Sequence, residues 1–191
     1  MIRFADAPAT CILLAANVLV FLAEERAGGS ARPDVALRFG AQYLPALRRG
    51  QWWRLAAAMF LHFGPVHLLC NMVSLYNLGP SLETAFGPFR CLLLYLLSGL
   101  AGNLLTWLRD LRIPRPAVSA GASGAIFGLL GAYLAFALLP STRPFVDVFS
   151  TLSILALNLA YGFSAKSINM AAHLGGLLSG LLLALLFLLV P

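Results

Sequence analysis

The sequence contains very little charge, since only 10% of its 191 residues are Asp, Glu, Lys or Arg and Lys166 is its single lysine. Soluble domains carry about 25% charged residues. Disordered chains combine low hydrophobicity with high net charge, whereas 60% of this sequence is hydrophobic. The composition therefore excludes both a soluble globular domain and a disordered tail.

Cysteine is also scarce, and the three that are present are Cys11, Cys70 and Cys91. An odd number of cysteines inside or beside hydrophobic segments does not fit the paired framework of a secreted disulfide scaffold. We predict that all three are buried thiols without a disulfide role. The sequence also lacks the Gly-x4-Gly-Lys phosphate loop of nucleotide-binding proteins.

The few charges divide the chain into six uncharged windows, at residues 7–23, 55–82, 91–108, 116–142, 148–165 and 167–191. A helix needs about 20 apolar residues to cross a bilayer, with a lower limit near 17. These windows predict a single all-α membrane domain, residues 1–191, with spans at about 8–23, 66–82, 89–107, 123–139, 144–162 and 169–190. Such a domain would be embedded in the lipid bilayer. The net charge of +6 does not indicate a nucleic-acid partner, because the basic residues lie between hydrophobic segments.

Two features of the first 65 residues complete this organisation. The first span is expected to be a retained helix rather than a signal peptide, because Arg3 is offset by Asp6 and no small-x-small cleavage site precedes Glu24. Residues 24–65 form the one large loop. Within it, residues 52–61 are expected to make a short amphipathic or membrane-embedded piece before Pro65 opens the second span.

Polar side chains occur near the starts of the second, fourth and sixth spans. His67 and Asn71 lie in the second, Ser123 opens the fourth, and His173 lies near the start of the sixth. Serial spans alternate in direction, so these three starts share one membrane face. At about 1.5 Å rise per residue, all four side chains lie less than about 10 Å below that face. Polar groups inside a span are costly and commonly functional.

This set of groups fits nucleophilic catalysis. A serine hydroxyl needs a neighbouring base, which His173 offers to Ser123. Asn71 and His67, four residues apart on one helix face, could donate hydrogen bonds to an oxyanion. Two structural alternatives stay open at this point. Ser123 could belong to a packing seam of small residues, and His173 or Asn71 could serve only as hydrogen-bonding groups between helices.

Glycines flank these polar groups. Gly121 and Gly124 leave room for a substrate backbone to approach Ser123. Gly176 and Gly180, with the spacing Gly-x3-Gly, are typical of a close-packing helix face and would allow the sixth span to approach the fourth.

Other chemistries fit the sequence less well. A zinc metalloprotease needs His-Glu-x-x-His, whereas His62 and His67 are five apart with no Glu between them. Aspartyl proteolysis within the membrane needs two Asp inside spans, and all Asp residues lie outside or at span edges. A transporter would place its polar groups near the bilayer midplane. No metal site is predicted.

The motifs resemble those of rhomboids, the six-helix bacterial type of intramembrane serine protease, from about Phe39 to Gly180. The matching pieces are QWWR at 51–54, FLHFGPVHLLCNM at 60–72, Leu78-Gly79, Glu83-x3-Gly87, GASGAIFG at 121–128 and AHLGGLLSG at 172–180. Gly-x-Ser-Gly alone is a weak signal, but the set in this order and at these span positions is highly specific.

The resemblance implies a role for each matching residue. Ser123 would be the nucleophile and His173 its general base, in a dyad without Asp. His67, Asn71 and the Ser123 N–H would form the oxyanion hole. The remaining matched residues would be structural and near the site, and they are Gly121, Gly124, Phe127, His62, Trp53, Arg54, Glu83, Gly176 and Gly180. Phe127 stands where some relatives carry a Tyr that packs on the catalytic His.

The resemblance also implies the activity. The protein would be an intramembrane serine endopeptidase that cleaves transmembrane segments of other membrane proteins, with no metal or organic cofactor. The fifth span and the 163–168 loop resemble the substrate gate and cap. The alternative is a non-catalytic rhomboid-like protein that binds transmembrane clients.

The orientation in the membrane is contested by two signals. The face with the polar groups would carry ten basic residues, Arg26, Arg32, Arg38, Arg48, Arg49, Arg54, Arg109, Arg112, Arg115 and Lys166, against Arg3, Arg90 and Arg143 on the other. The positive-inside rule places the larger group in the cytoplasm. The resemblance instead implies a bacterial inner-membrane protein with cytoplasmic termini and an active site outside, and we adopt this layout.

Overall fold

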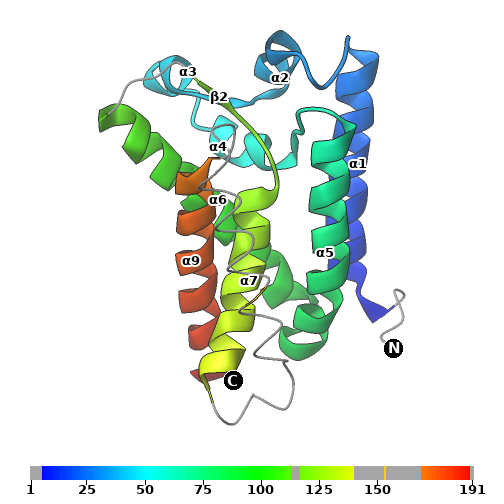
Figure 1. Cartoon of the computed structure of the whole chain (residues 1–191), viewed down its shortest axis with the longest axis vertical. Coiled ribbons are helices and arrows are strands. Elements are labelled where there is room, and N and C mark those ends of the chain that lie inside the picture. The colour runs from blue at the N-terminus through cyan, green and yellow to red at the C-terminus, as the bar shows by residue number, and fades with distance from the viewer. Residues whose placement is uncertain (1–5, 113–116, 140–152, 154–168, 190–191) are drawn as a thin grey trace.

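The computed structural model describes residues 6–112, 117–139, 153 and 169–189. Its long helices are α1 (Pro8–Arg26), α5 (Pro65–Phe86), α6 (Pro88–Arg112), α7 (Ser123–Leu138) and α9 (Met170–Leu189), which pack side by side in one bundle (Figure 1). The predicted fifth span, 144–162, lies outside the described residues except for Ser153. The other five predicted spans each correspond to one of these helices.

The described helices have the length and composition of a membrane protein. Three of them, α1, α6 and α9, are long and apolar enough to cross a bilayer, and a fourth span is present if α5 is joined to the short helices before it across a 90° bend. α7 is a shorter apolar helix of 16 residues. The prediction of an all-α membrane bundle is therefore confirmed.

The predicted large loop is mostly ordered into short elements. It contains α2 (Pro33–Phe39), β1 (Gln42–Tyr43), α3 (Leu44–Arg48), α4 (Arg54–Ala57) and the 3₁₀ helix η2 (Ala58–Phe60). β1 pairs antiparallel with β2 (Val118–Ser119), so that Gln42 lies opposite Ser119. This two-residue ladder, absent from the predictions, ties the loop to the segment that leads into α7. The short elements gather at one end of the bundle (Figure 1).

Proline and glycine determine where three of the five long helices begin. α1, α5 and α6 each carry a proline at their start, at Pro8, Pro65 and Pro88. Proline suits the first turn of a helix because its missing N–H would have no intrahelical partner there. Gly64, with φ of 85°, precedes α5, and Gly87, with φ of 81°, turns the chain from α5 into α6. The chain therefore reverses direction sharply between these helices.

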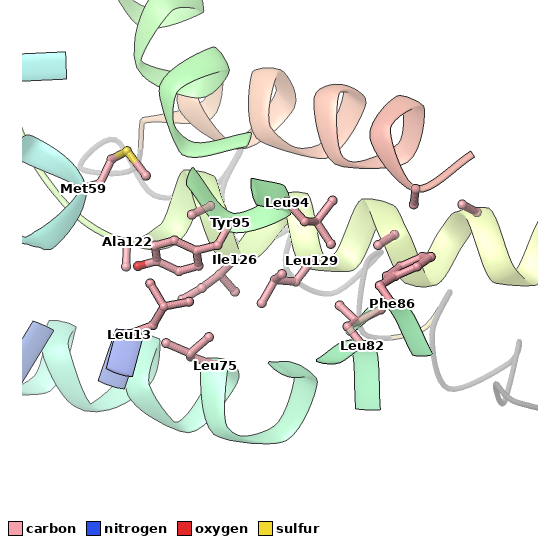
Figure 2. Packing of buried hydrophobic residues seen from close by; sticks show 14 of the residues in the cluster. Leu13, Met59, Leu75, Leu82, Phe86, Leu94, Tyr95, Ala122, Ile126 and Leu129 are labelled. Carbon is pink, nitrogen blue, oxygen red and sulfur yellow. The ribbon is translucent and has the colours of Figure 1, made fainter. Parts of the chain in front are cut away.

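The main hydrophobic core lies between α1, α5, α6 and α7. Figure 2 shows Leu13, Leu75, Tyr95 and Leu129 packed together there, each no more than 4% exposed. The buried Tyr95 hydroxyl accepts a hydrogen bond from Asn17 Nδ2 at 3.3 Å, which satisfies its polar end. This core holds the first four described long helices at fixed separations below the functional end.

α7 and α9 approach each other closely along glycines. A Cβ added to Gly176 would lie within 3.0 Å of the Gly124 carbonyl oxygen, and one added to Gly180 would do the same at Gly128. Apolar helices gain little from hydrophobic burial in lipid, so their association depends on close van der Waals contact between small residues. The two helices therefore pack backbone against backbone, which brings their starts together.

Glu83 lies at the end of α5 away from the functional end, about 24 Å from His67 by helix rise. Its carboxylate accepts hydrogen bonds from the backbone N–H groups of Ala9 and Thr10 at 2.7 and 2.8 Å, and from Thr10 Oγ1 at 2.8 Å. It therefore caps the N-terminus of α1. The resemblance implied that Glu83 is a structural residue near the site. Glu83 does make structural hydrogen bonds, but it lies far from Ser123.

The cysteine prediction is wrong in one respect. All three cysteines are free, but only Cys91 is buried, whereas Cys11 is half-buried and Cys70 is exposed. Cys70 precedes the buried Asn71 on α5, and neighbouring positions on a helix point about 100° apart. The Cys70 side chain therefore faces away from the bundle.

Candidate active site

The starts of α5, α7 and α9 meet at the end of the bundle covered by the short elements. The Gly121 N–H, just before α7, donates to the Ala58 carbonyl at 2.9 Å. A Cβ on Gly121 would lie 3.0 Å from His67 Nε2 and 3.7 Å from Ser123 Oγ. A Cβ on Gly124 would lie 3.3 Å from the Ala172 carbonyl oxygen, at the start of α9. The structure thus brings the predicted polar residues of the three helices to one end.

Ser123 is the first residue of α7 and is half-buried. The first N–H groups of a helix have no intrahelical partner, so the Ser123 hydroxyl lies beside backbone donors. Gly121 adopts φ of 140°, a conformation that side chains rarely adopt, and its missing Cβ leaves space occupied by the His67 imidazole. Gly121 is therefore required both by backbone geometry and by the approach of α5.

His173 stacks on Phe127. Their ring centroids are 4.0 Å apart and their planes differ by 12°. Phe127 follows Ser123 by four residues, so the two share a face of α7, and the stack holds the imidazole on that face. His173 is 7% exposed, and its Nδ1 has no hydrogen-bond partner among the described residues. The position of this imidazole therefore depends on ring packing and on the start of α9.

His67 is held in one tautomer by the backbone before α5. The Phe63 N–H donates to His67 Nδ1 at 3.3 Å. A neutral imidazole carries its proton on the nitrogen that does not accept, so the proton is on Nε2. This nitrogen lies beside Gly121, where an added Cβ would also lie 3.7 Å from Ser123 Oγ. His67 therefore presents a hydrogen-bond donor to the space above Ser123.

Asn71 lies one turn further along α5 on the same face and is 6% exposed. Its Nδ2 donates one hydrogen bond to the His67 carbonyl at 3.2 Å. A side-chain amide has two N–H donors, so the second is available for another acceptor. Asn71 thus combines a bond within its own helix with a spare donor near His67.

Asn169, which the sequence analysis did not single out, anchors the start of α9. Its Oδ1 accepts the Ala172 N–H at 3.3 Å, as an N-cap does. Its Nδ2 donates to Ser119 Oγ at 2.8 Å and to Thr106 Oγ1 at 3.0 Å, and Arg109 donates to its Oδ1 at 3.0 Å. An Asn directly before an apolar helix is an N-cap signal in the sequence, but these distant partners are visible only in the fold.

The Trp53-Arg54 pair organises the loop rather than the reacting groups. Arg54 donates to the backbone carbonyls of Leu37 and Ala41 at 2.8 and 3.0 Å, and its guanidinium lies 4.8 Å from the centre of the Trp53 ring. The Trp53 ring covers the backbone of Gly40, where no Cβ would fit. These contacts hold α2 and β1 against α4, above the helix starts.

His62 lies between η2 and α5 and is 1% exposed. Its ring packs edge to face on His67, with centroids 5.1 Å apart. Its backbone N–H donates to Glu24 Oε2 at 3.2 Å. His62 is therefore a buried neighbour of the predicted oxyanion residues, and Glu24 is a residue that the sequence analysis did not identify.

No group of three or more His, Cys, Asp or Glu in the described parts of the chain is arranged to hold a metal ion.

The sequence predicted that ten basic residues share the membrane face of the polar groups. Those of the ten that the structure describes lie at the same end as Ser123, in the loop and at the ends of α1 and α6. Arg32 forms a hydrogen-bonded ion pair with Asp34 at 3.1 Å, which lowers the pKa of that carboxyl below its usual value. Arg109 pairs in the same way with Asp110, so two carboxylates at this end are paired with neighbouring arginines.

Comparison with known proteins agrees with this architecture. The family model described as the rhomboid domain matches residues 49–190. The chain is 36% identical over 173 residues to the rhomboid protease GluP of Bacillus subtilis, which covers 90% of this chain and 33% of that protein. It is 40% identical over 146 residues to the putative rhomboid protease YdcA of the same organism, covering 75% of this chain and 71% of that protein.

A plant relative, RHOMBOID-like protein 5 of Arabidopsis thaliana, is 40% identical over 157 residues, which cover 81% of this chain and 50% of that protein. The chain thus spans about a third of GluP and half of the plant protein. The family model covers well over half of the chain, and each match includes most of it. The chain is an integral membrane protein that belongs to the rhomboid family.

Proposed function

We propose that this protein is an intramembrane serine endopeptidase that hydrolyses peptide bonds in transmembrane segments of other membrane proteins. The observation that carries the proposal is the convergence of Ser123 with His67 and with the Phe127–His173 stack at one end of the bundle. The relatives whose names describe them as rhomboid proteases support it.

The reaction begins with attack by Ser123. Its Oγ forms a bond to the scissile carbonyl carbon while His173 takes the hydroxyl proton as general base. The C–N bond then breaks, and the protonated His173 returns the proton to the departing amine. Water hydrolyses the acyl-enzyme by the reverse sequence, with His173 again as base. The stack on Phe127 keeps the imidazole on the Ser123 face of α7 through both steps.

The developing negative charge on the carbonyl oxygen needs fixed donors. His67 Nε2–H, the spare Asn71 N–H and the Ser123 N–H supply them in this proposal. Such donors are effective because they are oriented before the reaction, and losing one costs about 100- to 1,000-fold in kcat. The backbone bond from Phe63 to His67 Nδ1 supplies that orientation for one of the three.

The substrate class follows from the surroundings of the site. The groups lie within two turns of three helix starts, so a scissile bond must lie near one membrane surface. A transmembrane helix hides its carbonyl groups in internal hydrogen bonds. Substrate segments with small or helix-breaking residues, which unwind at low cost, are therefore the ones expected to reach Ser123.

The test is cleavage of a reporter membrane protein by purified enzyme in liposomes. Ser123→Ala and His173→Ala should each abolish cleavage, while Ser74→Ala, which removes a hydroxyl that donates to the Cys70 carbonyl within α5, should leave it unchanged. A serine-directed fluorophosphonate should label the wild type and not Ser123→Ala. Cleavage retained in Ser123→Ala, or no labelling of the wild type, would support the non-catalytic client-binding alternative.

We propose further that the protein resides in a bacterial inner membrane with its active site outside and its termini in the cytoplasm. This follows the family layout against the positive-inside rule. A reporter enzyme that is active only in the cytoplasm should be active when it is fused after Pro191. A signal from the outer compartment would reverse the assignment.

A further inference from the structure

Two consecutive carboxylates stand at the C-terminal end of α1, at Glu24 and Glu25. The helix dipole disfavours anions in the last turn of a helix. The side chain of Glu24 is also fully buried, and burying a carboxylate is costly unless it is hydrogen-bonded. Both effects destabilise α1, so the role of Glu24 must come from its contacts with other parts of the chain.

Glu24 contacts the turn that leads into α5. Its Oε2 accepts the His62 N–H at 3.2 Å, across 38 positions of sequence, whereas its Oε1 is buried with no partner in the described parts of the chain. Glu25 reinforces the same turn, because it accepts hydrogen bonds from Ser30, whose Oγ accepts the Gly64 N–H at 3.2 Å. The end of α1 therefore holds the backbone of this turn at two points.

The residue between those two points is Phe63, and its N–H donates to His67 Nδ1. The direction of this N–H depends on the peptide plane between His62 and Phe63. The His62 ring, packed edge to face on the His67 ring, restricts the imidazole from a second side. A continuous set of contacts thus runs from the end of α1 to the nitrogen that determines the His67 tautomer.

We propose that Glu24 is a positioning residue for His67. Its buried carboxyl oxygen holds the His62–Phe63 backbone where the Phe63 N–H donates to His67 Nδ1, so that His67 keeps its proton on Nε2, on the side of Gly121 and Ser123. Without the hydrogen bond from the His62 N–H to Glu24, the turn rotates and the hydrogen bond from the Phe63 N–H to His67 Nδ1 weakens. The imidazole proton of His67 then distributes between Nδ1 and Nε2. The effect on the tautomer is independent of the activity, whereas the effect on catalysis rests on the proposed peptidase function.

The first measurement is the tautomer of His67, by ¹⁵N NMR of the full chain in lipid nanodiscs with labelled histidine. The chain has only three histidines, so single His→Gln variants assign every imidazole signal. Wild type should show an unprotonated Nδ1 and a protonated Nε2 at His67. Glu24→Met should shift the signals toward a mixture, whereas Glu24→Gln, whose amide oxygen can still accept the His62 N–H, should keep the wild-type pattern. An unchanged His67 spectrum in Glu24→Met overturns the proposal.

The second measurement is kinetic, on the reporter substrate. Glu24→Met should lower kcat at least about tenfold with little change in KM, and by no more than the loss of a whole oxyanion donor. Glu24→Gln should retain most of kcat. In a His67→Ala background, Glu24→Met should cause no further loss, because the residue acts through His67. Equal losses in both backgrounds would indicate a general structural role and would refute the positioning role.

Asp34→Asn is the matched control, since it neutralises an exposed carboxylate on α2, at the same end of the bundle as Glu24, and should leave both readouts unchanged. If Glu24→Met does not fold, Glu24→Ser, which removes the acceptor and leaves room for water, replaces it in both measurements. The NMR experiment can be performed on Ser123→Ala protein. An inactive wild type would therefore contradict the proposed function alone, and a Glu24-independent tautomer would contradict this inference alone.

Discussion

The glycine contact between α7 and α9 makes a sharp prediction about activity. Gly176 follows His173 by three residues on the same face of α9, and its Cα faces the backbone of Gly124. Gly176→Ala places a methyl group within 3.0 Å of the Gly124 carbonyl oxygen, closer than real Cβ contacts. Backbone cannot yield as a flexible side chain can, so the two helices must separate.

The size of the effect follows from the required movement. Ordinary contact begins at 3.4 Å, so restoring it separates the helices by on the order of 1 Å, and overpacking of this kind costs about 1–3 kcal/mol of stability. A displacement of about 1 Å at a reacting group can cost about 100-fold in rate. His173 lies within one turn of the altered residue, so we expect Gly176→Ala to lower kcat by about that factor.

Gly180→Ala separates the catalytic effect from the stability effect. Its Cβ would meet the Gly128 carbonyl oxygen just as closely, but it lies two turns from His173. Both variants should show similarly lowered unfolding midpoints in the same detergent, whereas kcat should fall much further in Gly176→Ala. Leu178→Ala, on the exposed side of α9, should change neither quantity. Wild-type kcat in Gly176→Ala, or an equal loss of kcat in both glycine variants, would refute the reasoning.

Two further predictions concern the ends of the bundle. Glu83→Gln replaces one of two acceptor oxygens facing Ala9 and Thr10 by an amide donor, and it should lower the free energy of unfolding by about 3 kcal/mol. Because Glu83 is far from Ser123, kcat measured below the unfolding transition should stay unchanged. A variant of wild-type stability would contradict the capping role. Asn169→Ala removes the N-cap of α9 and its bonds to Thr106 and Ser119, and it should lower the free energy of unfolding by about 1 kcal/mol. It should also lower kcat by a larger factor than it raises KM. An unchanged kcat would show that the position of His173 does not depend on Asn169.

The sequence alone could predict that these polar residues lie at one end of the bundle, because the signals were local or followed from simple counting. Charge-free windows predicted the five long helices that the structure describes, three of which are long and apolar enough to cross a bilayer, and the alternation of spans predicted that the starts of three of them lie at one end. The polar residues near those starts, from His67 to His173, then had to lie at similar depth. The same windows could not predict the β1–β2 ladder, because its two residues per strand have no periodicity of their own.

The positions of the supporting residues depended on contacts between distant parts of the chain. Glu83 matched a family motif but lies far from Ser123, and its partners at the start of α1, more than 70 positions away, are visible only in the fold. Cys70 is apolar by type, yet its angular position on α5 turns it outward. Residue identity does not reveal which neighbours a helix face will meet.

The sequence by itself determined that this is a helical membrane protein of the rhomboid type with a serine, two histidines and an amide near one surface. Only the tertiary structure decided the state of those groups: the His173 ring is fixed by its stack on Phe127, and the His67 proton is directed to Nε2 by a backbone N–H. The physical reason is that span length and charge distribution are properties of continuous segments. A ring stack or a tautomer instead depends on atoms that different helices bring within hydrogen-bonding or van der Waals distance.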